Sequence, residues 1–109
     1  MAKGILLVQS RPVSAEAEAE YNRWYDEEHI PDVLKVPGIV AARRFRARDA
    51  GPITVSGGAQ PYVIVYELEA DDLNTPMDEL AKRTAEGSVT LSDTIDRPSL
   101  TTVYELLGE

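Results

Sequence analysis

The only histidine of the chain, His29, lies near the end of an acidic and aromatic run, NRWYDEEHIPDV, at residues 22–33. The unperturbed pKa of an imidazole is about 6.5, so this side chain can accept or donate a proton near neutral pH. Tyr25 precedes it by four residues and Asp26 by three, spacings at which either side chain could hold a ring nitrogen. We therefore predict a catalytic group in which His29 is the general acid or base and Tyr25 and Asp26 support it.

The charge state of His29 follows from its expected position at the end of a helix. A helix C-terminus favours the protonated imidazole, and so do the nearby acids Asp26 and Glu28. The sequence thus predicts a raised pKa for His29. An alternative interpretation stays open, in which His29 only caps the helix end and packs against Trp24 or Tyr25.

Four more residues are candidates for substrate binding. Trp24 could line an apolar pocket, although aromatic residues at helical spacing are often core residues. Tyr66 and Tyr104 lie on expected strands and could offer phenol donors, or could simply pack there. Arg44 could hold a carboxylate or an enolate, and its alternative role is to protect an edge strand by charge.

The elements that would position these residues can be read along the chain. The apolar run GILLVQ at residues 4–9 predicts a buried strand. Ser14 is a good N-cap for the helix that follows. That helix should end near His29, because Ile30 precedes Pro31 and is pushed out of the α region. Pro31 can then open a second short turn.

The rest of the chain adds three strands and one more helix. Thr75 should cap this helix and Gly87 should end it. The order βαββαβ predicts an α+β, ferredoxin-like fold with a four-stranded antiparallel sheet, as one domain over residues 1–109. The expected strands span residues 38–47, 61–69 and 100–107, and the helix spans residues 76–86.

Two helices can cover only one face of this sheet, yet several strands are apolar on both faces. A bare second face would be an apolar patch of roughly several hundred Å², which monomers avoid. We therefore expect two copies to pack these faces together as a homodimer, a dimeric α/β barrel. In the alternative, the loops at residues 48–60 and 88–99 would fold over that face.

Composition excludes several classes of partner. The chain of 109 residues has a net charge of −8, which argues against nucleic acid and against anionic membrane surfaces. It holds no cysteine and a single histidine, so we expect no disulfide and no multi-histidine metal site. No apolar run approaches the ~20 residues that span a bilayer, and the N-terminal MAKGILLVQS is too short for a signal peptide. A cytoplasmic protein is the expectation.

The spacing around His29 resembles the first-helix signature of the EthD-like families of dimeric α/β-barrel proteins. Tyr21, two residues, the pair Trp24-Tyr25, three residues, and then His29-x-Pro31 match an aromatic, an aromatic pair and His-x-Pro. The common form of the pair is Tyr-Trp, so the two rings stand in reversed order here. The continuation VLKVPGIVAARRF is also similar, and the resemblance covers about residues 14–46.

Relatives on this fold include cofactor-free polyketide cyclases and dehydratases, muconolactone isomerase-like enzymes, quinol monooxygenases and haem-binding proteins. The resemblance implies a small cofactor-independent enzyme, of lyase, isomerase or cyclase type, that moves protons on a small oxygenated substrate, with aromatic and polyketide-like molecules among the candidates. His29 would act in a pocket between the first helix and the sheet, gated by the loop at 48–60. The alternatives are a non-catalytic dimer that binds a hydrophobic ligand, a haem protein with His29 as axial ligand, and a cofactor-free monooxygenase.

Overall fold

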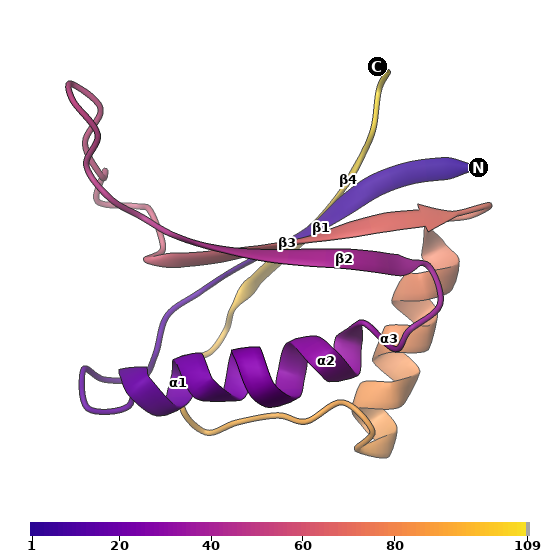
Figure 1. Ribbon diagram of the computed structural model, residues 1–109, viewed down its shortest axis with the longest axis horizontal. Helices are drawn as coiled ribbons and strands as arrows, with labels where there is room; N and C mark the ends of the chain where they lie inside the picture. Colours follow the sequence, from indigo (N-terminus) through magenta and orange to yellow (C-terminus); the bar gives the residue numbers. More distant parts are fainter. Residues whose placement is uncertain (109) are drawn as a thin grey trace.

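The computed structural model describes residues 1–108 and forms one antiparallel sheet with its helices on one side (Figure 1). The strand order is β2-β3-β1-β4, and this ferredoxin-like α+β arrangement confirms the predicted fold class. The strands are β1 (Ala2–Ser10), β2 (Ile39–Arg46), β3 (Tyr62–Ala70) and β4 (Leu100–Glu105).

The first helical segment is continuous but changes its pitch. It consists of α1 (Glu18–Trp24), a π-helical turn η1 (Tyr25–His29) and α2 (Ile30–Val33). The prediction that the helix ends near His29 is therefore wrong. A proline inside an α-helix collides with the carbonyl four residues earlier. The wider turn just before Pro31, in which the Ile30 N–H donates to the Tyr25 carbonyl, lets the helix continue through it.

The helix ends also differ in detail from the expectations. The Ser14 hydroxyl accepts the Ala17 N–H in a turn that precedes α1, so the helix begins later than Ser14. The second helix, α3 (Asn74–Glu86), begins at Asn74, whose N–H donates to the Asp72 carboxylate. The N-cap residue is Leu73, which makes no side-chain cap bond, so the prediction that Thr75 caps this helix is wrong. Gly87 ends α3 with a φ of 83°, as predicted.

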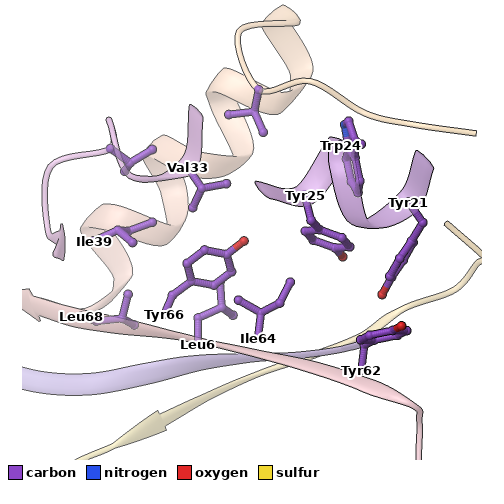
Figure 2. Packing of buried hydrophobic residues seen from close by; sticks show 12 residues of the cluster. Leu6, Tyr21, Trp24, Tyr25, Val33, Ile39, Tyr62, Ile64, Tyr66 and Leu68 are labelled. Carbon is purple, nitrogen blue, oxygen red and sulfur yellow. The ribbon is translucent and has the colours of Figure 1, made fainter. Parts of the chain in front are cut away.

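The hydrophobic core lies between the sheet and the helices. Along β3, Tyr62, Ile64 and Tyr66 are buried, whereas Val63 and Val65 point to the other face and are only partly covered. The aromatic residues of α1 and η1 pack onto this layer from the helix side (Figure 2). This alternation has the period of two that a strand requires, and it matches the sequence prediction for β3.

The opposite side of the sheet carries no helix, and we call it the open face. Residues paired directly across antiparallel strands share a face, which places Leu7 with Val65 and Ile5 with Tyr104. The loop between β2 and β3 projects beyond the sheet on this side, whereas the 88–99 segment runs along the helix side (Figure 1). Neither loop folds over the open face, so that alternative is wrong. The apolar residues of the open face are Ile5, Leu7, Phe45, Val63, Val65, Leu100 and Tyr104.

No helix within residues 1–108 combines the length and apolar character that crossing a bilayer requires.

Candidate functional site

The π-helical turn brings the two residues at the centre of the site together. Trp24 and His29 are five residues apart, and in η1 the backbone bonds also span five residues. Their rings stack with centroids 4.5 Å apart and an interplanar angle of 28°. The Tyr25 ring meets the imidazole edge-on, at 5.4 Å. A regular α-helix would place residues five apart on different sides, so the pitch change creates this aromatic cluster.

A cavity of about 470 Å³ lies on the helix side of the sheet, beside this cluster. The sheet contributes Leu6, Val8 and Tyr66 to its wall, and α3 contributes Leu80 and Thr84. The 88–99 segment supplies much of the remaining wall, whereas no residue of the loop at 48–60 lines the cavity. The expected gating by the 48–60 loop is therefore not what the structure has. The lining of the cavity includes three of the aromatic site candidates and the histidine: Trp24, Tyr25, Tyr66 and His29.

The backbone carbonyl of Thr90 holds the His29 ring in one orientation. Its Nδ1 lies 2.9 Å from the carbonyl oxygen of Thr90, and a carbonyl can only accept, so Nδ1 carries the proton. The Asp32 carboxylate fixes Thr90 by accepting its N–H at 3.1 Å and its hydroxyl at 2.7 Å. This leaves Nε2 as the unprotonated nitrogen, and no residue within 1–108 bonds to it.

The pKa of His29 is lowered rather than raised, which corrects the sequence prediction. Burial is the largest cause, and the bond to Thr90 and the charge of Asp32 oppose it only in part. The helix continues past His29, so the helix end that was expected to favour the imidazolium is not there. A lowered pKa keeps the ring neutral at neutral pH, which suits a general base rather than a general acid.

Two buried polar atoms of residues that line the cavity have no hydrogen-bond partner. They are the Tyr66 hydroxyl and the Trp24 indole Nε1, in side chains of residues only 2 % and 3 % exposed. Burial raises the pKa of Tyr66, so its hydroxyl stays protonated and can donate. Leaving a buried hydroxyl unpaired costs about 1–3 kcal/mol, and a ligand that accepts from these groups would recover part of that cost.

Tyr25 faces the cavity with its ring but not with its hydroxyl. The hydroxyl lies 3.3 Å from the Ser10 Oγ, which is also 2.6 Å from the Tyr21 hydroxyl. Burial raises the pKa of Tyr25, and it raises that of Tyr21 to about 12. Tyr25 therefore supports His29 through ring contact, and its hydroxyl belongs to a buried network next to the sheet.

Arg44 and Asp26 lie together, away from the cavity. The Arg44 guanidinium donates to Asp26 at 3.0 Å and to Asn22 at 2.7 Å. It also lies over the rings of Tyr21 and Tyr25, with its central carbon 5.0 Å from the Tyr25 centroid. The predicted bond between Asp26 and His29 is thus absent, because the Asp26 carboxylate faces β2. Arg44 braces the tyrosine layer and lies outside the cavity lining.

Tyr104 belongs to the other side of the sheet. It is paired with Ile5 on the open face and is 50 % exposed. Its hydroxyl therefore cannot reach the helix-side cavity, and the expectation that Tyr104 binds substrate there is wrong for the single chain. Tyr66, by contrast, has the opposite orientation on β3 and reaches the cavity.

Sequence reasoning missed three residues of the site: Asp32, Thr90 and Arg97. Asp32 and Thr90 orient His29, and Arg97 lines the cavity. Thr90 and Arg97 lie in a polar connection with no strand or helix period, so nothing in its pattern tells which face it covers. Within residues 1–108 there is no group of three metal-ligating side chains.

Comparison with solved structures places the fold among three full-length neighbours. An EthD family protein from Bacillus halodurans C-125 matches with a TM-score of 0.59 and 15 % identity, over 98 % of this chain and 100 % of that one. A candidate monooxygenase from Shewanella loihica PV-4 matches at 0.61 and 14 %, over 100 % and 99 %. A dimeric ferredoxin-like protein of unknown function from Jannaschia sp. CCS1 matches at 0.57 and 19 %, over 95 % and 99 %.

These likenesses establish the fold. They confirm the resemblance to EthD-like and dimeric ferredoxin-like proteins that the first-helix spacing indicated. No protein-family model matches the sequence, and no curated protein sequence does. At identities below 20 % a shared fold carries no activity with it, so function has to be argued from the cavity itself.

Proposed function

We propose that the protein is a cofactor-independent enzyme in which His29 removes a proton from carbon next to a carbonyl group. The observation that carries this proposal is the free Nε2 of His29 in a wall that also presents the unpartnered Tyr66 hydroxyl. A neutral imidazole is a competent base near neutral pH. A protonated phenol is a competent donor to the oxygen on which negative charge develops.

The proposed step is an enolisation. The C–H bond next to the carbonyl breaks, the proton goes to Nε2, and the bonding pair forms the C=C bond of an enolate. The carbonyl oxygen takes the charge and accepts a hydrogen bond from Tyr66. Asp32 and Thr90 keep the protonated Nδ1 turned away from the substrate. Isomerisations, cyclisations and dehydrations of carbonyl compounds that pass through an enolate begin with this step, so the reaction after the enolate decides which class applies.

Exchange of deuterium tests this step without knowledge of the natural substrate. The probe is 4-oxo-4-phenylbutanoate, an aryl ketone whose protons next to the carbonyl exchange with D₂O through the enolate, followed by proton NMR. We expect the protein to accelerate exchange, His29→Ala to lose about 10²-fold or more of that acceleration, and Tyr66→Phe to lose part of it. Tyr104→Phe is the matched control, because its hydroxyl lies on the open face.

The other candidate functions are outcomes of the same experiment. A protein that binds the probe without accelerating exchange would contradict the enzyme proposal and favour a ligand-binding protein. A His29→Ala variant that accelerates exchange as the original protein does would contradict the assignment of His29 as the base. Oxygen uptake in the same samples tests the monooxygenase alternative. A Soret band on adding haem, lost in His29→Ala, would identify His29 as an axial ligand instead.

We also propose that two copies associate through the open face. Phe45, Leu100 and Tyr104 are each 50 % exposed there, and burying a large apolar side chain contributes about 1.5–3 kcal/mol. One structural neighbour is described as dimeric, and a two-fold axis would place the same surface of both copies in contact. Location in the cytoplasm and the absence of nucleic acid and membrane partners stay predictions from composition.

A further inference from the structure

The cavity has a local charge opposite to that of the protein. The chain as a whole carries a net charge of −8, yet none of the described residues that line the cavity is acidic. Arg97 is the one permanent cation in that lining, and it is exposed to solvent. It therefore lies at the mouth, where a charged group of a bound molecule would stay partly hydrated.

Arg97 also has no competing partner within the protein. By comparison, Arg23 pairs with Glu20 and Glu28, and Arg83 pairs with Glu79. No ion pair or side-chain hydrogen bond joins Arg97 to any residue within 1–108. The guanidinium fork of Arg97 is thus free to bind a carboxylate through two parallel hydrogen bonds.

The buried polar groups of the cavity also favour a ligand that accepts hydrogen bonds. The indole N–H of Trp24 can only donate, and the raised pKa of Tyr66 keeps its hydroxyl a donor. Both atoms are buried and unpartnered. The remaining wall is largely aliphatic and aromatic, with Leu6, Val8 and Leu80 among its members. A complementary molecule has acceptor oxygens, an apolar body and no cationic group.

We infer that the cavity selects an organic monoanion, a small keto or enol acid whose carboxylate binds Arg97 and whose carbonyl oxygen accepts from Tyr66. This inference names the substrate class of the proposed enzyme and rests on it for the role of the carbonyl. The charge selection itself depends only on Arg97. The size of the cavity, about 470 Å³, suits a molecule of one or two rings rather than a polymer or a lipid.

Trp24, the single tryptophan of the chain, reports binding directly because it lines the cavity. The experiment titrates the intact protein with 4-oxo-4-phenylbutanoate and, separately, with its neutral amide, following tryptophan fluorescence. We expect the acid to bind about tenfold or more tightly than the amide. Arg97→Gln should weaken binding of the acid about tenfold and leave binding of the amide unchanged. Arg48→Gln is the control, since it removes the same charge from the β2–β3 loop.

Equal affinity for acid and amide, or an Arg97→Gln variant that binds the acid as the original protein does, would overturn the inference. An equal loss with Arg48→Gln would also overturn it, because only the net charge would then matter. The proposed function fails separately, if His29→Ala keeps the deuterium exchange rate. Arg97→Gln should raise KM for exchange of the acid at nearly unchanged kcat, whereas His29→Ala should lower kcat.

Discussion

The Nδ1 atom of His29 donates to the carbonyl oxygen of Thr90 across a sequence separation of 61 residues. This contact joins the π-helical turn to the 88–99 segment, and it decides which nitrogen of the ring is free. The 88–99 segment also helps to bury the imidazole, and burial is the largest cause of the lowered pKa of His29. The contact therefore links the tautomer, the protonation state and the closure of the cavity wall.

Proton exchange should depend on pH through His29. Because burial places the pKa of His29 below its ordinary value, the neutral base should predominate at pH 7, and the rate should fall only as pH drops below about 6.5. The imidazole resonances of the one histidine give that pKa directly by NMR titration. A measured value at or above 6.5 would contradict the argument that burial lowers the pKa of His29.

The same pKa shift predicts a pH dependence of stability. The unfolded chain binds the His29 proton more readily than the folded one, so the free energy of unfolding should rise with pH between the folded pKa and about 6.5. His29 should thus contribute its full stability above 6.5 and lose it as pH falls through that window. Urea unfolding at pH 7.5 and 5.5 measures this difference, and His29→Gln should reduce it.

Asp32 should matter for stability and for the orientation of His29. Asp32→Ala removes the acceptor of both Thr90 bonds, and hydrogen bonds to a charged group contribute about 1.5–3 kcal/mol. We expect a loss at the lower end, because the carboxylate is partly exposed, with faster proteolysis within residues 88–99. Asp78→Ala, at an exposed position on α3, should change stability by less than about 0.5 kcal/mol. Equal effects of the two variants would refute the role of Asp32.

Tyr66→Phe should separate stability from activity. Its hydroxyl is buried without a partner, so removing it should leave the free energy of unfolding unchanged or raise it by about 1 kcal/mol, while proton exchange slows. Tyr25→Phe removes a hydroxyl that lies against Ser10 and should instead destabilise the fold by about 1 kcal/mol. Thermal unfolding of both variants checks this contrast. A clear destabilisation by Tyr66→Phe would mean that the hydroxyl has a partner in the folded protein.

Association through the open face should be broken by a single charge. Leu7 lies on β1 between β3 and β4 on that face, so Leu7→Lys should shift the protein from dimer to monomer in sedimentation velocity at micromolar concentration. Val13→Lys, which changes an exposed valine outside the sheet, should leave the dimer intact. A compact monomer for the unaltered protein would refute the homodimer.

The fold could be predicted because local signals agreed with one another. The alternation through Tyr62, Ile64 and Tyr66, and the glycine at position 87, each specify one element. The end of the first helix could not be predicted from Pro31 alone. The usual penalty for an internal proline assumes α-helical pitch, and the π-helical turn changes that pitch over residues 25–29.

Four of the residues predicted for the site line one cavity, whereas the partners of His29 could not be predicted; that this cavity is a functional site stays a prediction. Trp24, Tyr25, His29 and Tyr66 meet at the cavity because helix and strand periods orient them. The partners of His29 and the identity of the cavity's arginine depend on how residues 88–99 fold back, which is a tertiary contact without a local pattern. The sequence predicted Arg44 as the arginine that binds substrate, but its ion pair with Asp26 holds it outside the cavity lining.

The π-helical turn makes the number of residues between Trp24 and His29 as consequential as their identity. At the pitch of a plain α-helix, the present spacing of five would put the indole and the imidazole on different sides, whereas a spacing of four would keep them on one face. A distant relative without the π-helical turn could therefore keep the stacked pair if one residue were deleted between the two rings. When such chains are aligned, a one-residue gap inside this interval indicates a regular helix with the same ring pair, whereas full spacing without the wide turn indicates that the two rings have separated.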